Sequence, residues 1–316
     1  EGEGPTCGSS RDVEDARAVC RRLGIPHDAF NLRDRFDAAV VNPFCGAYLE
    51  GRRPNPCIAC NRFLKFEALQ KRRRQLGLDY VATGHYARVA YDAESGKYRL
   101  LRGAERRKDQ SYVLYQLTQH QLAHLLLPVG DYDKPAIRDK AREAGLDNAD
   151  KGDSQDICFV PGGDYVTFLQ RQGLTLTPGD FLDEAGRVLG RHRGLPCYTI
   201  GQGKGLGVAV GRHVYVLEKD QVHNAIVLGD DAALYASSLL ASHVNWISGQ
   251  IPAAPVRCAA KTRYSQVETP CTAYPLPDGG LRVVFDQPQR AITAGQAVVL
   301  YDGDEVLGGG TIEKSE

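Results

Sequence analysis

The hydrophobic positions in the first half of the chain change between helical spacing and short apolar runs. Apolar residues recur three or four positions apart between Val13 and Leu23 and predict a helix that ends at Gly24. The pattern predicts further helices at about 34–49, 62–76, 111–126 and 135–144, and strands at about 27–32 and 79–83. Helices that alternate with short apolar strands are typical of a parallel sheet flanked by helices. We therefore predict an α/β domain over residues 1–160, with ligands expected beyond the carboxyl ends of its strands.

Strand patterns dominate the rest of the chain. Residues 86–105 predict a hairpin that turns at 94–97, and residues 153–161 predict a strand that follows a polar loop. Residues 178–220 are rich in glycine and short strands, which indicates a small α+β central domain, placed at 161–226. Beyond about residue 227 the alternation predicts an all-β domain, a β-barrel, over 227–316. Its predicted strands are 256–262, 269–274, 281–285, 296–301 and 306–312.

The composition is that of an ordinary globular protein. The 316 residues carry 39 basic and 39 acidic side chains, so the formal net charge of zero gives no indication of a nucleic-acid partner. No apolar run reaches about 18 residues, which predicts no membrane span, and the first residues do not resemble an export signal, which predicts a cytoplasmic protein. The sequence lacks methionine and opens directly into a loop and a helix, so we expect it to be a piece of a longer protein.

Nine cysteines are scattered along the chain, an odd count that indicates reduced thiols rather than a disulfide framework. Cys57 and Cys60 form a Cys-x-x-Cys between a proline-rich loop and a predicted helix, where the helix dipole favours a thiolate. Two alternatives are half of a structural zinc site, for which no second close pair supplies ligands, and a thioredoxin-like disulfide exchange. Cys158, taken alone, is typical of a buried strand thiol.

Other polar segments each allow a structural and a functional interpretation. His85 is either a general acid or base or the polar end of a strand, and residues 108–112 contain helix-capping types. The glycine-rich segment 201–207 lacks the Gly-Lys-Ser/Thr ending of a phosphate loop, and we interpret it as a loop of the central domain. A solvated helix end explains the basic run 71–74 as well as RNA does.

Seven short motifs occur in one order along nearly the whole chain. They are Arg53-Pro-Asn-Pro-Cys-Ile-Ala-Cys-Asn61, Ala82-Thr-Gly-His-Tyr86, Lys108-Asp-Gln-Ser-Tyr112, Asp153-Ser-Gln-Asp-Ile-Cys-Phe159, Gly205-Leu-Gly207, Lys261-Thr-Arg-Tyr264 and Leu307-Gly-Gly-Gly310. Together they resemble the bacterial tRNA-specific 2-thiouridylases, the family that makes 2-thiouridine at the wobble position of tRNA. Each motif is short, but seven in the family's order are a specific signal.

The resemblance implies a fold and a reaction. The family has a nucleotide-binding α/β domain of the PP-loop ATPase kind, a small central domain and a C-terminal β-barrel. Its reaction uses ATP with Mg²⁺ to adenylate O2 of uridine 34, which turns that oxygen into a leaving group. A sulfur-carrier protein loads a persulfide onto the cysteine that corresponds to Cys158, and the cysteine that corresponds to Cys60 attacks this persulfide. A disulfide between Cys60 and Cys158 then forms and is reduced by an external thiol.

The resemblance also implies which residues bind, because a wobble base must be splayed out to reach such a pocket. By motif position, Asn55, Pro56 and Cys57 are expected to line the target base, and Gly84 is expected to contact ATP. The residues expected to contact tRNA are His85, Lys108, Asp109, Gln110, Arg263, Tyr264 and Gln296.

The sequence departs from the family's pattern in three places. The Ser-Gly-Gly-x-Asp-Ser loop that holds the ATP phosphates is absent, with its strand and helix, so the chain as printed is expected not to turn over. Cys57 stands where some relatives have aspartate, so Cys57, Cys60 and Cys158 would ligate a 4Fe-4S cluster in an alternative, cluster-dependent thiolation. Gly203 replaces a basic residue of the glycine-rich loop. A truncated, non-catalytic tRNA-binding relative and a structural zinc protein are the remaining alternatives.

Overall fold

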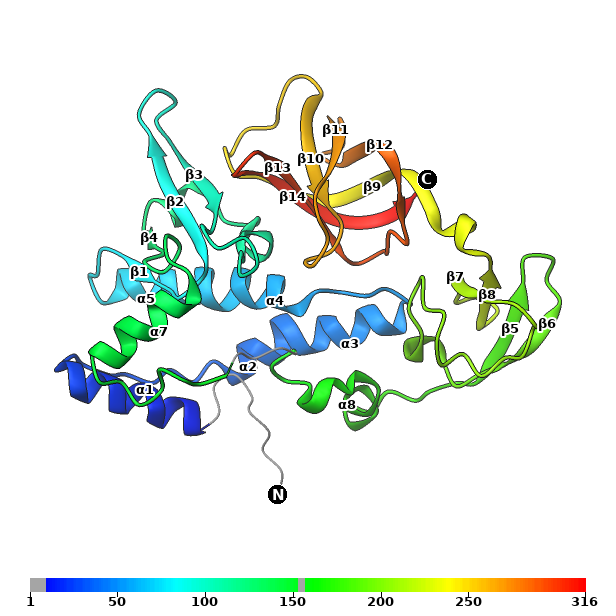
Figure 1. Ribbon diagram of the computed structural model, residues 1–316, viewed down its shortest axis with the longest axis horizontal. Coiled ribbons are helices and arrows are strands. Elements are labelled where there is room, and N and C mark those ends of the chain that lie inside the picture. Colours follow the sequence, from blue (N-terminus) through cyan, green and yellow to red (C-terminus); the bar gives the residue numbers. More distant parts are fainter. Residues whose placement is uncertain (1–9, 153–156) are drawn as a thin grey trace.

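The chain forms three parts in the computed structural model, which describes residues 10–152 and 157–316. An α/β part comes first, a small sheet domain second and a β-barrel third (Figure 1). Part of the motif at 153–159 and all of Cys7 therefore lie outside the described residues. The predicted fold class, an α/β domain followed by an α+β domain and a barrel, is confirmed.

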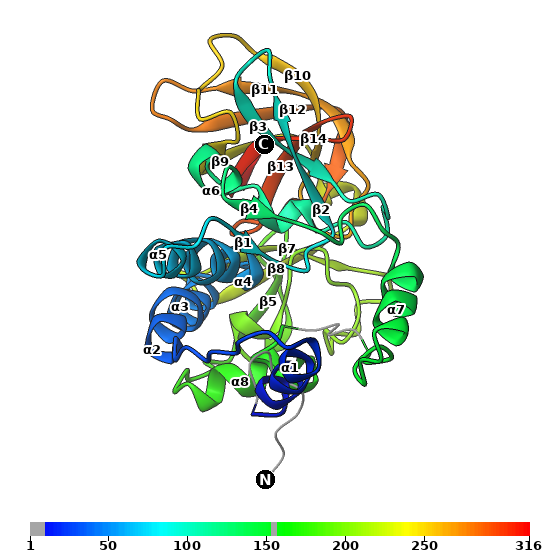
Figure 2. The same ribbon diagram turned by 90° about the vertical axis from the view of Figure 1, so that its left-hand side faces the viewer.

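Most helices of the α/β part lie where the hydrophobic spacing predicts them. They are α1 (Ser10–Leu23), a continuous run of α2 (Arg33–Phe36), a π-helical turn (Asp37–Val41) and α3 (Asn42–Leu49), and a second run of α4 (Pro56–Ala59), a π-helical stretch (Cys60–Ala68) and α5 (Leu69–Gln75). Strands β1 (Val81–Ala82) and β4 (Leu125–Leu126) pair in parallel, with Val81 opposite Leu125. Helices α3 and α5 lie on one side of this pair and α7 (Lys134–Glu143) on the other (Figure 2).

Four local predictions in this part are wrong. The helix predicted at 62–76 begins at Pro56, because Asn55 caps it there, so Cys57 and Cys60 lie inside the helix and not in the loop before it. Residues 27–32 are not a strand, because no described strand lies beside them to complete a hydrogen-bonded ladder. The helix predicted at 111–126 is instead a 3₁₀ helix (Ser111–Leu114) followed by α6 (Gln119–Leu122). Thr118 starts a new helix there, since its Oγ1 accepts a hydrogen bond from Gln121 N at 3.3 Å and the Gln121 side chain bonds back to Thr118 N. The described end of the predicted strand 153–161 forms a turn that leads into a 3₁₀ helix (Pro161–Gly163).

The C-terminal strands confirm the predicted barrel. They are β9 (Tyr235–Trp246), β10 (Val256–Lys261), β11 (Thr269–Pro275), β12 (Leu281–Arg290), β13 (Ala297–Asp302) and β14 (Glu305–Ser315). Strand β13 pairs with both β10 and β14, which closes the sheet. The predicted hairpin, β2 (Ala87–Asp92) and β3 (Lys97–Arg102), joins this sheet because β3 pairs with β14, with Val306 opposite Leu100. A hairpin from the first part thus extends the sheet of the last.

The glycine run of the last motif has a packing role in the barrel. A side chain on Gly309 would place its Cβ 2.3 Å from Val298 O, and one on Gly308 would place it 2.2 Å from Asn245 O. Both acceptors are backbone atoms of neighbouring strands. Only glycine therefore allows β14 to pass this closely between β9 and β13.

The central part contains α8 (Tyr165–Arg171), 3₁₀ turns at Leu195–Cys197 and Asp231–Leu234, and a four-stranded sheet. Its strands, in the order β6-β5-β8-β7, are β5 (Gly179–Asp183), β6 (Val188–His192), β7 (Tyr215–Asp220) and β8 (Ala225–Gly229). Strands β5 and β8 run parallel, and the other pairs are antiparallel. This sheet extends past residue 226, where the sequence analysis ends the central domain.

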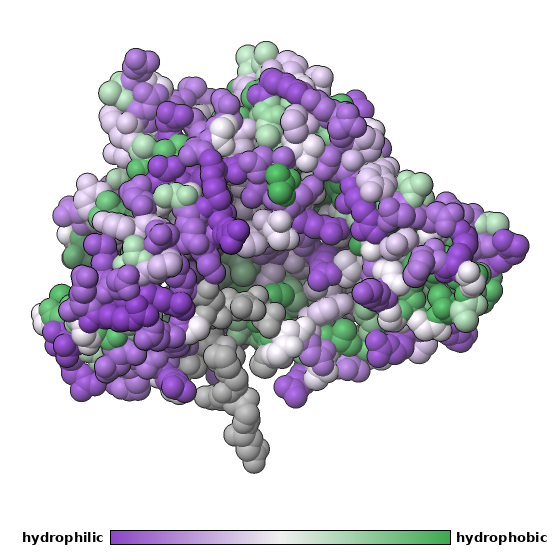
Figure 3. All heavy atoms as spheres, viewed as in Figure 1, coloured by the Kyte–Doolittle hydropathy of each residue, from purple (hydrophilic) through white to green (hydrophobic). Residues whose placement is uncertain are grey.

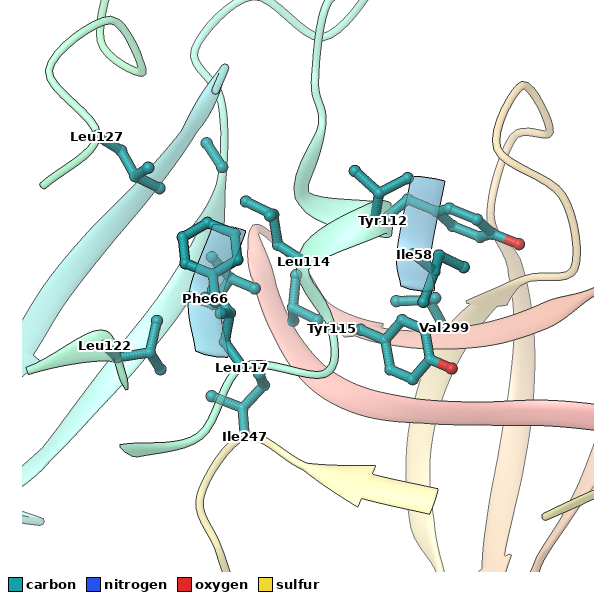
Figure 4. Packing of buried hydrophobic residues seen from close by; sticks show 14 of the residues in the cluster. Ile58, Phe66, Tyr112, Leu114, Tyr115, Leu117, Leu122, Leu127, Ile247 and Val299 are labelled. Atoms are coloured by element: carbon teal, nitrogen blue, oxygen red, sulfur yellow. The ribbon is translucent and has the colours of Figure 1, made fainter. Parts of the chain in front are cut away.

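A shared hydrophobic core fixes the barrel against the α/β part (Figure 4). Ile58 from α4, Tyr112 and Tyr115 beside the 3₁₀ helix, and Val299 from β13 are all buried in it. Tyr112 also donates a hydrogen bond across the boundary to Ala297 O at 2.8 Å. Burial of apolar surface contributes about 25 cal/mol per Å², so this core holds helix α4 in a fixed position beside the barrel.

Candidate functional site

The Cys-x-x-Cys motif lies at the start of a helix whose first turn is set by its own sequence. Asn55 has extended backbone and caps α4, since its Oδ1 accepts a hydrogen bond from Cys57 N at 3.1 Å. Pro56 is buried at the first helical position, which suits a residue without an N–H. Cys57 is exposed and Cys60 is half-buried one turn later, so both thiols lie near one helix face.

The loop before this helix is fastened to both other parts of the protein. Arg53 N donates to Ala294 O at 3.0 Å, and Gln296 Nε2 donates to Arg53 O at 2.5 Å. The Arg53 guanidinium bonds to the Thr199 hydroxyl of the central part. Gln296, expected to contact tRNA, is therefore used here to position the loop that precedes the two cysteines.

His85 lies in the interior beside the cysteine helix. Its Nδ1 is 2.7 Å from Thr83 Oγ1 and its Nε2 is 3.1 Å from Asn61 Oδ1. Burial, followed by the nearby Lys65 ammonium, lowers the pKa of His85 to about 3, so the ring is neutral at physiological pH. These contacts are those of a structural residue at a strand end. Asn61 and Thr83 lie inside two of the seven motifs, but no local pattern predicts their role as partners of His85.

Residues 108–110 form the turn that precedes the 3₁₀ helix. Asp109 is buried, and its carboxylate accepts hydrogen bonds from Gly103 N, Ser111 N and Ser111 Oγ at 2.8–3.1 Å. Gln110 Oε1 accepts from Tyr86 N at 3.0 Å. Lys108 is partly exposed. Asp109 and Gln110 are thus engaged in intramolecular hydrogen bonds, whereas Lys108 lies nearer the surface.

The Lys-Thr-Arg-Tyr motif of the barrel reaches this turn. Arg263 Nη2 donates to Ala291 O at 2.5 Å, and Tyr264 donates its hydroxyl hydrogen to Asp109 O at 3.0 Å. The ring of Tyr264 is 43% exposed. Burial raises the pKa of Tyr264, and the adjacent Asp109 and Cys57 raise it further. Tyr264 also packs on Tyr112, with ring centroids 5.9 Å apart, and the 3₁₀ helix of Tyr112 contacts α4, so the structure brings the barrel motif to the cysteine helix.

Cys158 belongs to a segment that packs on the other helical run. Its neighbour Phe159 contacts Phe36 and Phe44, with ring centroids 5.5 and 5.3 Å apart. The π-helical turn 37–41, which links these two phenylalanines, also contacts α4. The segments that carry Cys60 and Cys158 therefore pack against the same helical run, and Cys158 is half-buried.

Gly84 directly follows β1, at the carboxyl end of the parallel pair. A side chain added to Gly84 would meet no atom within 4 Å, so a ligand can approach this backbone closely. This observation fits the expected ATP contact. The predicted cluster fits less well, since no group of three potential metal ligands exists among the described residues, which include Cys57, Cys60 and Cys158.

A cavity of about 440 Å³ lies between α3, α4 and the barrel. Asn55 and Ile58 line its helical side, and His243 and Ala297 line its barrel side. The face drawn in Figure 3 is mostly hydrophilic, and hydrophobic residues show in the hollow between the barrel and the helices below it. Within the described ranges no helix is both long and apolar enough to cross a membrane.

Together, the parallel strand pair with open backbone at its carboxyl end, the thiol-bearing helix and the attached barrel define an α/β nucleotide-binding protein with a cysteine site. Three family models match the chain: "tRNA methyl transferase HUP domain" over residues 1–162, "tRNA methyl transferase PRC-barrel domain" over 166–230 and "Aminomethyltransferase beta-barrel domain" over 236–312. The chain belongs to the family of tRNA-specific 2-thiouridylases, as its similarity to curated relatives shows.

Three of these relatives, each named tRNA-specific 2-thiouridylase MnmA, illustrate the similarity. The protein of Acetivibrio thermocellus is 49% identical over 98% of this chain and 87% of its own length. That of Carboxydothermus hydrogenoformans is 51% identical over 98% of this chain and 85% of its own. That of Moorella thermoacetica is 52% identical over 97% and 86%.

Proposed function

We propose that this protein transfers sulfur to a tRNA uridine and so makes 2-thiouridine at wobble position 34. The observation that carries the proposal is the near end-to-end similarity to relatives of that name, at 49–52% identity. The geometry supports it, because two half-buried thiols lie on segments that pack against one helical run. The cytoplasm, with its tRNA and reduced thiols, is the expected compartment.

We place the nucleotide at the open backbone of Gly84, beyond β1. ATP bound there with Mg²⁺ would supply the adenylyl group that makes O2 of the uridine a leaving group. In this proposal the Ser-Gly-Gly-x-Asp-Ser loop of the family holds the phosphates, and residues 1–316 by themselves, which contain no such loop, give no turnover. Activity is therefore to be tested with the gene and any codons upstream of residue 1.

The sulfur step uses Cys158 as the persulfide carrier and Cys60 as the nucleophile. A sulfur-carrier protein donates the outer sulfur to Cys158. The Cys60 thiolate then attacks Cys158 Sγ, so that a Cys60–Cys158 disulfide forms and hydrosulfide leaves. Hydrosulfide attacks C2 of the activated uridine, AMP departs with the oxygen, and one proton is released. An external thiol reduces the disulfide and returns both cysteines to their starting state.

The target base is proposed to lie beside Asn55, Pro56 and Cys57, next to the exposed ring of Tyr264. Aromatic rings of this kind stack on splayed bases. Lys108 and Tyr264 are the proposed direct contacts to tRNA. The other predicted contacts act in this proposal by holding the site in shape through their hydrogen bonds within the protein: His85, Asp109, Gln110, Arg263 and Gln296.

The test uses cells that lack their own 2-thiouridylase, complemented with this gene, and nucleoside mass spectrometry of their tRNA. We expect 2-thiouridine to appear, to be lost with Cys60→Ser or Cys158→Ser, and to persist with the control Cys20→Ser on helix α1. If a stable protein gives no 2-thiouridine, the proposed enzyme activity is refuted and an RNA-binding relative is the better account. Visible absorption by anaerobically purified protein would favour the cluster-dependent version over the persulfide.

A further inference from the structure

A second cavity, of about 630 Å³, lies between the segment after β3 and the loop that joins β10 to β11. Its charged lining residues are four cations and two carboxylates: Arg102, Arg106, Arg107, Lys261, Asp109 and Glu268. None of the four cations has a role in the proposed sulfur chemistry.

Both carboxylates of this cavity are already occupied. Asp109 accepts three hydrogen bonds from Gly103 and Ser111, and Glu268 pairs with Arg102 Nη1 at 2.7 Å. Arg106 pairs with Asp304 outside the cavity. Within residues 10–152 and 157–316, Arg107 and Lys261 have no carboxylate within ion-pair distance, and the four cations of the lining outnumber its two carboxylates.

Arg102 is the buried one of the four cations that line this cavity. It is only 4% exposed, and its Nε and Nη2 have no hydrogen-bond partner among the described residues. Its guanidinium lies over the Tyr301 ring at 4.0 Å, and Lys261 Nζ lies 5.7 Å from the same ring. Burial, and then the charge of Arg102, lower the pKa of Lys261. Glu268 and Asp109 offset part of this charge, but four cations line the cavity against two carboxylates, which leaves a local preference for an anion.

We propose that Arg102, Arg107 and Lys261 form a subsite for a phosphodiester of the bound tRNA. Tyr264 lines this cavity and packs on Tyr112, whose 3₁₀ helix contacts α4, where the target base is proposed, so a phosphate near that base would reach the subsite. Arg107 and Lys261 would contact the phosphate from the accessible side, and Arg102 would add its field from below. This inference rests on the proposed function, because it requires that the RNA is bound at Cys57.

The test measures binding of a tRNA anticodon stem-loop by fluorescence anisotropy over a series of salt concentrations. We compare wild-type protein with Arg107→Gln, Lys261→Gln and the double variant, which remove charge without cutting into the core. Arg257→Gln and Lys314→Gln, in ion pairs elsewhere on the barrel, are controls of equal charge change. Each lost phosphate contact should weaken binding and flatten the dependence of log Kd on log salt by about 0.7, whereas the controls should leave the slope unchanged.

If the wild type binds the stem-loop and the double variant has the same dependence of log Kd on log salt, the subsite is overturned and the proposed function stands. Absence of wild-type binding would overturn the proposed function together with the subsite. Inorganic phosphate at constant ionic strength is the probe for a free anion. If it raises the Tm of the wild type but not of the double variant, while the RNA slopes are equal, the cavity binds a free phosphate and not tRNA, which also overturns the proposal.

Discussion

The Asp109 carboxylate offers a sharp test of structural against RNA-binding roles in the candidate site. Its Oδ1 accepts hydrogen bonds from Gly103 N at 3.0 Å and Ser111 N at 3.1 Å, and its Oδ2 accepts from Ser111 Oγ at 2.8 Å. Because Asp109 is buried, water cannot readily replace these bonds. We therefore expect the side chain to stabilise the turn before the 3₁₀ helix rather than to bind phosphate, which a carboxylate would repel.

The expected loss of stability follows from the hydrogen-bond donors that lose their acceptor when the Asp109 side chain is removed. Asp109→Ala strands two buried backbone N–H groups, each costing about 1–3 kcal/mol, so we expect the free energy of unfolding to fall by about 3 kcal/mol. Asp109→Asn keeps an oxygen for both N–H groups, and its amide can donate to the Ser111 hydroxyl. The asparagine variant loses only the charge on the acceptor, for a cost of about 1 kcal/mol.

The assay is urea unfolding of both variants, with anticodon stem-loop binding measured on the folded protein. The control is Asp131→Ala, whose side chain is 74% exposed and should change stability by less than about 0.5 kcal/mol. Asp109→Asn is expected to bind RNA no more weakly than the wild type. Wild-type stability in Asp109→Ala would refute the reasoning, as would a tenfold loss of RNA affinity in a stable Asp109→Asn protein.

Two further predictions concern stability. Since the pKa of His85 falls to about 3 in the folded protein, from an ordinary value near 6.5, the unfolded chain binds a proton first on acidification. Below pH 6.5 this group should lower the free energy of unfolding by about 1.4 kcal/mol per pH unit. In urea unfolding at pH 7 and pH 5, His85→Gln should therefore lose less stability on acidification than the wild type. An equal loss in both proteins would contradict the prediction. Gly309→Ala should destabilise the protein by about 1–3 kcal/mol, because its methyl group would meet Val298 O at 2.3 Å. The control Gly46→Ala in α3, with open space around it, should stabilise slightly. A Gly309→Ala protein with wild-type Tm would show that β14 shifts freely.

Local rules account for the parts of the site that the sequence predicted well. Asn55 and Pro56 are a helix cap and a first-turn proline that mark the observed start of the cysteine helix, although the hydrophobic spacing predicted this start later, at residue 62. Strands β10 and β11 have one buried face and alternate accordingly, β13 is a continuous buried run, and all five predicted strands occur. The role of His85 could not be read in this way, because Asn61, which holds its Nε2, comes near only in the fold. The Asp109 carboxylate bonds within its own turn, as the capping types at 108–112 suggest, and only its backbone oxygen meets a distant residue, Tyr264.

The sequence by itself therefore determined the family, most helices of the first domain, and the barrel, since motif identity and hydrophobic period are properties of neighbouring residues. Tertiary structure alone decided that the β2–β3 hairpin joins the barrel sheet and that residues 27–32 are not a strand. It also decided that Arg102, Arg107 and Lys261 line one cavity with Tyr264. Strand partners and charge clusters depend on which distant segments meet, and a pattern along the chain contains no distance between them.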